Sequence, residues 1–357
     1  MKPFTYVQHP ARVVFGAGSR SQIVREVEAL RGDRVMLIAH EGSDEIAELL
    51  GSRVVLRWNE IVQHVPLDLA ERARDAAEAA SIDVIICVGG GSATGLAKAI
   101  ALTSRRPIVA VPTTYAGSEQ TTIYGLTGDR HKQTGKSIDV LPRAVIYDPE
   151  LTVGIPASVT GPSAFNALAH SVEAFYAPGC NPVITALAKE AIAAIRDSLP
   201  RVMAAPSDID ARGALLYGAY LSGVALGATS AAFHHKICHV LGGTFDLVHA
   251  DAHSVVLPHA VAFLAPSIPD EMKSLGEVLG AEPAGALWDL AVESGVPTSL
   301  ESLGLSESDL AEAAERATAE IAKIAAPGNP RPCSEQQMLG LLQRAFAGAR
   351  PTPGDAP

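Results

Sequence analysis

Cysteine is scarce in this sequence, and its spacing excludes a disulfide framework. The four cysteines are Cys87, Cys180, Cys238 and Cys333, and no two of them form a CxxC pair. Small secreted domains that depend on disulfides carry more cysteines at closer spacing. The pattern therefore predicts reduced thiols and a cytoplasmic protein.

Basic charge and long apolar runs are also lacking. The 28 Lys and Arg residues are outnumbered by 39 Asp and Glu, which gives a net charge of −11, and no basic stripe breaks this balance. We therefore expect neither nucleic acid nor an anionic membrane as a partner. No apolar run reaches the roughly 20 residues of a membrane span, and the first residues lack the apolar segment of a signal peptide.

Aromatic residues make up only 5% of the chain, whereas apolar residues make up 48% and charged residues 19%. This composition is typical of a folded chain, and abundant alanine favours helices that pack closely through small side chains. With 357 residues, the chain is long enough for two domains with their own cores.

The first half alternates short apolar runs with helical patterns. The expected strands are 12–15, 35–39, 54–56, 83–88, 107–112 and 144–147, with a small β excursion at 121–128. Strands that are apolar throughout, with helices between them, are typical of a parallel sheet covered on both faces. We therefore expect an α/β domain over residues 1–157.

After Asp148-Pro149 the pattern changes, and from about residue 160 no convincing strand is present. Helical patterns separated by prolines follow instead. They cover 161–177, 181–199, 208–231, 234–245, 271–279, 284–294, 307–324 and 334–347. We expect an all-α domain over residues 158–350 and a flexible tail, rich in Pro and Gly, over residues 351–357.

Two loops at the ends of neighbouring expected strands have the chemistry of a pyrophosphate site. Gly89, Gly90, Gly91 and Ser92 separate a buried strand from a helix start, where glycines permit close approach and N–H groups attract anions. Ligands of open α/β sheets lie at such carboxyl ends. The next loop adds Thr113, Thr114, Tyr115 and Ser118 as expected cofactor-binding residues. A glycine triplet alone is equally consistent with a tight turn.

Six of the eleven histidines fall within residues 233–259, where an i,i+4 spacing occurs twice. His235 with His239, and His249 with His253, would each share one helix face, and a glycine pair breaks the pattern between them. Imidazole binds metals and moves protons near neutral pH, so this segment is a candidate active site.

Asn166 and His170 form another i,i+4 pair, and neither side chain suits an apolar core without a partner. Alone, such a pair is more often structural, as a bridge between helices or a contact to a carbonyl. Beside the histidine-rich segment, a shared site is the better interpretation.

Several motifs occur together in a fixed order. They are GGGSATGLAK at 89–98, PTTYAGSE at 112–119, VIYDPELT at 145–152, N-x-x-x-H at 166–170 and the histidines at 235, 239 and 249. This combination resembles the iron-containing alcohol dehydrogenase superfamily, which is related in fold to dehydroquinate synthase. The resemblance implies an NAD(P)-binding α/β domain, an all-α domain and an active site in the cleft between them. It also implies metal-ligand positions at Asn166, His170, His235 and His249, with His239 near the nicotinamide.

The sequence departs from that pattern at Asn166, where metal-dependent relatives have a carboxylate, and at Gly95, where relatives often have aspartate. Both departures resemble the maleylacetate reductase branch, which reduces the C=C bond of maleylacetate to 3-oxoadipate with NADH or NADPH in the degradation of aromatic compounds. Three imidazoles and a neutral amide should hold iron less well than a set with a carboxylate. We therefore expect NADH or NADPH as cofactor and no metal requirement.

Maleylacetate, with or without substituents, is a dianion, and a pocket without an acid at its centre should suit it. We expect His239 or His235 to supply a proton or stabilise the enolate oxygen. Residues expected to position carboxylates are His170, His249, Asn166 and Lys236. His40 stands where NAD-selective relatives carry an acid, so we expect use of both cofactors. The resemblance also implies a homodimer.

Three other functions remain open at this point. A metal-dependent alcohol dehydrogenase of the same fold would require iron or zinc. A lyase similar to dehydroquinate synthase would require zinc and consume no net NAD. A non-catalytic nucleotide- or metal-binding protein would oxidise no NADH with any enone or carbonyl substrate.

Overall fold

The computed structural model describes residues 3–7, 9, 12–40, 43–128, 131–324 and 328–353. The chain separates into two compact units, one of Gln8–Ile155 and one of Met1–Val7 together with Pro156–Pro357. The first is an α/β unit with a parallel sheet and the second is helical, which confirms the predicted fold class. Most of the predicted flexible tail lies outside the described residues, which end at Pro353.

Six parallel strands form the sheet of the first unit, in the order β1-β8-β5-β4-β2-β3. Their bounds are β1 Arg12–Phe15, β2 Val35–Ala39, β3 Val54–Trp58, β4 Val84–Gly89, β5 Ile108–Pro112 and β8 Ala144–Tyr147. β2, β4 and β5 are buried along their whole length, as expected for central strands with helices on both faces. The carboxyl ends of β4 and β5 are neighbours, with Gly89 beside Pro112.

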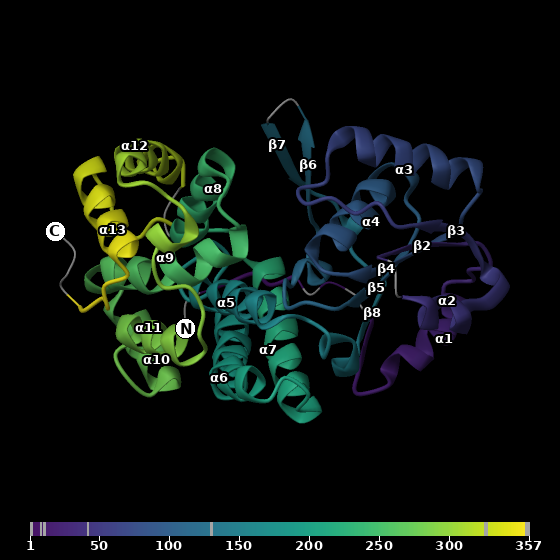
Figure 1. The fold of residues 1–357 in the computed structure, drawn as a ribbon, viewed down its shortest axis with the longest axis horizontal. Helices are drawn as coiled ribbons and strands as arrows, with labels where there is room; N and C mark the ends of the chain where they lie inside the picture. Colours follow the sequence, from purple (N-terminus) through teal and green to yellow (C-terminus); the bar gives the residue numbers. More distant parts are fainter. Residues whose placement is uncertain are drawn as a thin grey trace. The chain divides into compact units, whose positions relative to one another are not determined.

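Helices cover both faces of this sheet (Figure 1). α1 Ile23–Ala29 and α2 Asp44–Leu50 lie on one face, and α3 Leu67–Ala79 and α4 Gly91–Ser104 lie on the other. Alternate strand residues face the two layers, because side chains of a strand point to opposite faces in turn. In β2, for example, the first, third and fifth residues pack into the core that contains α1 and α2, and the two between them are also fully buried.

An antiparallel hairpin stands apart from the main sheet and consists of β6 Ile123–Gly128 and β7 His131–Lys136. The sequence predicts the first strand within 121–128. It gives no signal for the second, because HKQTGK lacks the apolar alternation on which strand prediction depends.

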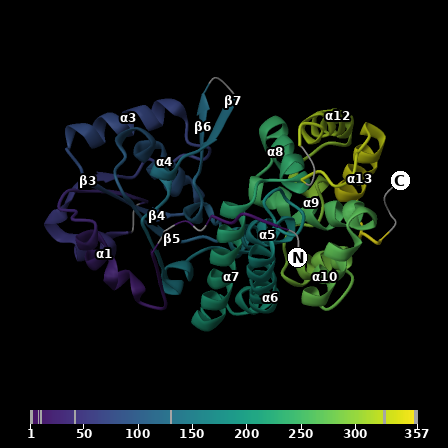
Figure 2. The same cartoon turned by 180° about the vertical axis from the view of Figure 1, so that it is seen from behind.

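The described part of the second unit contains nine α-helices, seen from behind in Figure 2. They are α5 Ala157–Glu173, α6 Pro182–Ala204, α7 Ile209–Ala228, α8 Phe233–Phe245, α9 His249–Leu264, α10 Pro269–Leu279, α11 Pro283–Glu293, α12 Leu310–Ile321 and α13 Glu335–Ala347. Small residues bring them close together. A Cβ on Gly218 of α7 would lie 2.7 Å from Ile195 Cγ1 and 3.0 Å from the carbonyl oxygen of Ala191, both on α6.

The helices that carry the predicted histidines are α5, α8 and α9, which pack against one another. The glycine pair between the two histidine pairs lies inside α8, which ends at Phe245 and is followed by Asp246 in the left-handed conformation. Among the described residues, no single helix is both long and apolar enough to span a membrane. α7 and α8 reach that length and composition only jointly, across a bend of 98°.

Candidate active site

The glycine loop joins β4 to α4 with a backbone that leaves no room for side chains. Gly89 has a φ of +150°, a backbone conformation that residues other than glycine rarely adopt. A Cβ on Gly90 would lie 2.9 Å from Thr114 Oγ1. Gly91 is the first residue of α4, a helix of 14 residues, so unpaired N–H groups and the positive end of the helix dipole lie at this loop. The loop therefore fits the pyrophosphate of a dinucleotide.

Close packing also accounts for Gly95, the position at which relatives often have aspartate. A Cβ there would lie 2.9 Å from Val65 Cγ2. Val65 itself has a φ of +48°, an unusual conformation for a β-branched residue. An aspartate at position 95 would therefore require the Val65 side chain to move.

The loop after β5 is anchored by a buried lysine of α4. Lys98 is 0% exposed, and its Nζ donates to the carbonyl oxygens of Ser118, Thr121 and Ile123 and to Thr121 Oγ1, at 2.7 to 3.0 Å. Four acceptors favour the charged amine, which has three protons to donate. Lys98 thus ties the helix of the glycine loop to the loop that carries Thr113, Thr114 and Ser118.

A second buried group holds the same loop from the side of β8. Tyr147 donates its hydroxyl hydrogen to Glu119 Oε1 at 2.7 Å and accepts a hydrogen bond from Gln120 Nε2 at 3.0 Å.

Burial shifts the pKa values of both charged residues at this loop. It lowers the pKa of Lys98 to about 7, although the negative charge of Glu119 acts in the opposite direction, and it raises the pKa of Glu119. Prediction missed Lys98 and Glu119 as anchors, although both lie inside quoted motifs, because their burial cannot be read from sequence.

The predicted cofactor residues of these loops differ in exposure. Thr113 and Thr114 are half-buried, as are Ser92 and Ser118, and Thr113 N donates to the carbonyl oxygen of Gly89 at 3.0 Å. Tyr115 is 0% exposed, so its side chain is part of the core of the first unit and offers no free surface. Tyr115 therefore shapes the loop and does not present its side chain at the surface.

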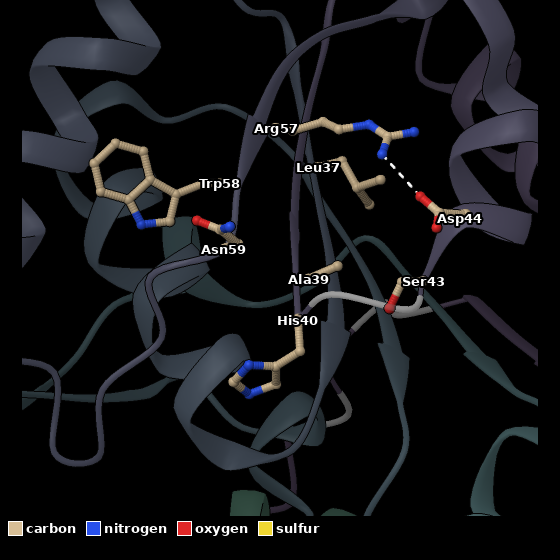
Figure 3. Close-up of a pocket in the computed structure, with 8 residues that line it drawn as sticks. All are labelled: Leu37, Ala39, His40, Ser43, Asp44, Arg57, Trp58 and Asn59. Atoms are coloured by element: carbon tan, nitrogen blue, oxygen red, sulfur yellow. Dashed lines mark hydrogen bonds and ion pairs between the residues drawn. The ribbon is translucent and has the colours of Figure 1, made fainter.

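A cavity of about 390 Å³ lies at the carboxyl ends of β2 and β3 (Figure 3). It is lined by Leu37, Ala39, His40, Ser43, Asp44, Arg57, Trp58 and Asn59. Arg57 Nη1 pairs with Asp44 Oδ1 at 3.0 Å, and both side chains are exposed. An indole, an imidazole, a guanidinium and a carboxylate on one cavity suit a nucleoside with a phosphate. His40, the predicted cofactor residue, lies on this cavity.

Three helices of the second unit bring the predicted histidines together. His170 lies on α5, His235 and His239 on α8, and His249 at the start of α9. The ring centroids of His170 and His235 are 4.8 Å apart, and those of His239 and His249 are 5.5 Å apart. Each of these two pairs joins rings from different helices, so the group depends on tertiary packing and not on the i,i+4 spacing alone.

Two further histidines of the same segment complete the group. His253 lies between the two pairs, with its ring 4.6 Å from that of His235 and 4.4 Å from that of His249. The Nε2 atoms of His253 and His249 are 3.0 Å apart, and the ring of His234 is 4.8 Å from that of His253. We call this set the imidazole cluster. Its members are His170, His234, His235, His239, His249 and His253.

The imidazole cluster runs from the protein interior to the surface. His170, His234, His235 and His253 are buried, His249 is half-buried and His239 is exposed. A ligand that approaches from solvent therefore meets His239 first.

The other two predicted site residues, Asn166 and Lys236, are not members of the imidazole cluster. Asn166 is one helical turn before His170 on α5, and its Oδ1 is buried with no hydrogen-bond partner among the described residues. Lys236 extends toward α12, where its Nζ is 4.0 Å from Glu320 Oε2. The structure thus leaves Asn166 beside the imidazole cluster and gives Lys236 a carboxylate neighbour outside it.

A buried carboxylate, Glu173, lies against the imidazole cluster, which corrects the expectation of a centre without an acid. Its Oε2 is 2.6 Å from His235 Nδ1, and its two oxygens accept the backbone N–H groups of Ala232 at 2.9 Å and His235 at 3.1 Å. Glu173 therefore caps the start of α8 and fixes His235 with a proton on Nδ1. The available sequence signal is its position three residues after His170 on one helix face.

Burial decides the charge of the inner part of the cluster. Burial alone would raise the pKa of Glu173. The neighbouring His235, the hydrogen bond between His235 and Glu173, and the neighbouring His234 outweigh burial and lower that pKa to about 2. Burial lowers the pKa of His234 to about 3, and it lowers the pKa values of His170 and His253 well below 6.5. These three imidazoles are therefore neutral near pH 7, and they can bind an anion only through N–H groups.

Known relatives match this chain over nearly its whole length. Residues 10–149 match the family described as iron-containing alcohol dehydrogenase, and residues 160–346 match the C-terminal part of the Fe-containing alcohol dehydrogenase family. The maleylacetate reductase of Pseudomonas sp. (strain P51) is 45% identical over 347 residues, which are 96% of this chain and 97% of that protein. The maleylacetate reductase of Burkholderia cepacia is 44% identical over 357 residues, 99% of this chain and 100% of that protein.

Solved structures show the same fold. The crystal structure of maleylacetate reductase from Agrobacterium tumefaciens matches with a TM-score of 0.94 at 41% identity, covering 98% of this chain and 100% of that one. The crystal structure of maleylacetate reductase from Rhizobium sp. strain MTP-10005 matches with a TM-score of 0.93 at 40% identity, with coverage of 98% and 100%.

Proposed function

The chain belongs to the iron-containing alcohol dehydrogenase family, and on that premise we propose that it is an oxidoreductase that reduces the C=C bond of maleylacetate to give 3-oxoadipate. One observation carries the proposal. Asn166 replaces the family's carboxylate beside a continuous group of imidazoles, in a chain 45% identical over 96% of its length to a maleylacetate reductase.

NADH or NADPH is the hydride source in this reaction. The glycine loop accepts a pyrophosphate because a Cβ on Gly90 would meet Thr114, so only a bare backbone lies there. When bound, the reduced nicotinamide supplies a hydride to the alkene carbon β to the ketone. The overall change consumes one proton, which must come from solvent or from a side chain and end on the neighbouring carbon.

His239 is the best placed residue to deliver that proton. It is the exposed member of the imidazole cluster, and its ring stacks on that of His249 at 5.5 Å. Because His239 is exposed, solvent can restore the proton that it gives up. His235, with its Nδ1 held by the Glu173 carboxylate, stabilises the enolate oxygen as an imidazolium, in which Nε2 also carries a proton to donate.

The substrate carboxylates are positioned by neutral donors. His170 and His249 can donate N–H groups, and the Asn166 amide can donate through its NH₂ group. An aspartate at position 166 would repel a dianion, whereas the amide does not. Lys236 acts on the substrate only through its positive charge at a distance. Its Nζ lies 4.0 Å from Glu320 Oε2 on α12 and so does not point into the imidazole cluster.

The donor set at the family's ligand positions fits iron poorly. It consists of three imidazoles and an amide, so no anionic ligand offsets the charge of a divalent ion directly. Asn166 Oδ1, His170 Nδ1 and His235 Nε2 are buried with no hydrogen-bond partner in the described structure. Turnover therefore requires no metal.

Both nicotinamide cofactors are substrates of this enzyme. In the cavity of Figure 3, Arg57 suits the 2′-phosphate of NADPH and Asp44 suits the ribose hydroxyls of NADH. Comparison of kcat/KM for the two cofactors tests this, and a preference above about a thousandfold, on the order of 4 kcal/mol, would contradict it.

The family resemblance extends the proposal to assembly and location. The enzyme forms a homodimer, which sedimentation equilibrium can test. It acts in the cytoplasm, as its reduced cysteines indicate, and fractionation of expressing cells can test that.

An assay of NADH oxidation tests the proposed reaction. Purified protein is mixed with NADH and either maleylacetate, a simple aldehyde or a simple ketone, and absorbance is followed at 340 nm. We expect kcat/KM for maleylacetate to exceed that for the aldehyde by several orders of magnitude. A faster reaction with the aldehyde would favour a metal-dependent alcohol dehydrogenase of the same fold.

A further inference from the structure

His234, Cys238 and His253 form a second set of donor atoms on the inner side of the imidazole cluster. All three residues are 0% exposed, and their nitrogen and sulfur donors lie within 4.8 Å of one another. None of the three occupies one of the ligand positions that the family resemblance implies. The site therefore differs from the family's metal site in its residues and in the presence of a thiol.

The spacing of the first two donors matches that around a tetrahedral cation. Cys238 Sγ and His234 Nε2 are 3.4 Å apart. With metal distances of about 2.0 Å to nitrogen and about 2.3 Å to sulfur, tetrahedral coordination separates the two atoms by roughly 3.5 Å. The pair therefore needs little movement to hold one ion.

The third donor is buried and unsatisfied. His253 Nδ1 has no hydrogen-bond partner among the described residues, and a buried polar atom without a partner is costly. His253 Nε2 is engaged with His249 at 3.0 Å. Nδ1 is therefore the nitrogen of His253 that is open to a ligand.

We propose that His234, Cys238 and His253 bind a thiophilic d¹⁰ cation, Zn²⁺ or Cu⁺. A thiolate and two imidazoles are a donor set that both ions favour. When the sulfur–metal bond forms, the thiol proton that Cys238 now shares with His234 leaves to solvent. Because His253 also contacts His249, an ion held there is one imidazole away from a ligand position that the family resemblance implies. The proposal is independent of the reaction proposed above.

The two cations differ in the number of ligands they require. Cu⁺ accepts three ligands, whereas Zn²⁺ prefers four. A fourth donor is close, since donor atoms of Glu173 and His235 lie within 4.8 Å of a donor of His234. Parallel titrations with Zn²⁺ and with Cu⁺ under anaerobic conditions therefore decide which ion the site prefers.

The test begins with the full-length protein after removal of all metals. Zn²⁺ or Cu⁺ is titrated against a chromophoric indicator to obtain stoichiometry and affinity, and X-ray absorption of the loaded protein reports the ligands. We expect one ion per chain, with one sulfur at about 2.3 Å and nitrogens at about 2.0 Å. The absorption measurement needs no variant, so it remains informative if a substitution in the core prevents folding.

Cys238→Ser is the decisive variant and Cys87→Ser its matched control. Cys87 is also buried, at 1% exposure, but lies on β4 in the other unit. We expect Cys238→Ser to weaken binding by at least about tenfold and to remove the sulfur signal, while Cys87→Ser binds as the wild type does.

Three results would overturn the proposal. One is the failure of wild-type protein to bind either cation. Another is a bound ion without a sulfur ligand. The third is binding that survives Cys238→Ser and is lost in His170→Ala, which would assign the ion to the family's ligand positions.

Discussion

Replacement of Glu173 by glutamine removes the negative charge of this buried side chain and keeps its size, so it tests what the charge contributes. The carboxylate receives His235 Nδ1 at 2.6 Å and the backbone N–H groups of Ala232 and His235 at 2.9 and 3.1 Å. A glutamine has only one oxygen to accept them, and its NH₂ group faces a donor. His235 then loses the partner that keeps the proton on Nδ1.

The expected effects follow from these contacts. One buried donor left unsatisfied costs about 1–3 kcal/mol, so the free energy of unfolding should fall by about 2 kcal/mol. Loss of the residue that orients a reacting imidazole typically lowers the rate by 10- to 100-fold. We expect kcat for maleylacetate to fall on the order of 100-fold, about 2.7 kcal/mol, with KM for NADH little changed.

Steady-state kinetics and urea unfolding measure both effects on the same preparation. ¹⁵N NMR of the histidine side chains reports the tautomer of His235, which a purely structural role of Glu173 would not alter. Glu312→Gln on α12 is a matched control, because this exposed carboxylate pairs only locally with Arg316, and we expect it to leave kcat unchanged. A folded Glu173→Gln enzyme with kcat within about twofold of wild type would refute the role assigned to Glu173.

Further predictions concern metal, pH and the cofactor loop. Exhaustive chelation, checked by metal analysis, should leave reduction of maleylacetate intact, and loss of activity restored by one added metal would refute this. Burial lowers the pKa of His234 to about 3, so below about pH 6.5 the unfolded chain binds a proton that the folded chain does not. The stability that His234 contributes is therefore fully present above that pH and should fall by about 1.4 kcal/mol per pH unit as pH drops toward 3, with His170 and His253 adding to the slope in the same direction. Urea unfolding between pH 7 and 5 should show a slope that is shallower in His234→Gln by about this amount, and an equal slope in both proteins would contradict it. Lys98→Met should raise KM for NADH about tenfold or more and leave KM for maleylacetate nearly unchanged, because it removes the anchor of the loop after β5. An equal rise in both KM values in steady-state kinetics would argue against that role.

Much of the fold was predictable from local patterns. The central strands of the sheet were found because they are apolar along their length, and the glycine loop was found because it ends one of them. β7 was missed because its pairing with β6, and not its own composition, makes it a strand. The grouping of residues 3–7 with the helical unit was likewise unpredictable, since it depends on contacts distant in sequence.

The site was predictable in its residue types and less so in its charges. Histidine spacing identified α8 and α9, but the neutrality of His170, His234 and His253 follows from burial, which appears only after folding. Glu173 gave no motif, yet it makes the shortest contact to His235 in the imidazole cluster. Lys236 was assigned to the site from its neighbours in sequence, whereas the helix turns its side chain toward α12.

The central claim is that this enzyme reduces a carbon–carbon double bond and not a carbonyl group. NADH carrying deuterium at the transferable position of the nicotinamide can be incubated with maleylacetate, and the product examined by NMR and mass spectrometry. We predict 3-oxoadipate with one deuterium on the carbon β to the ketone. A hydroxy acid with deuterium on the carbinol carbon would contradict the account.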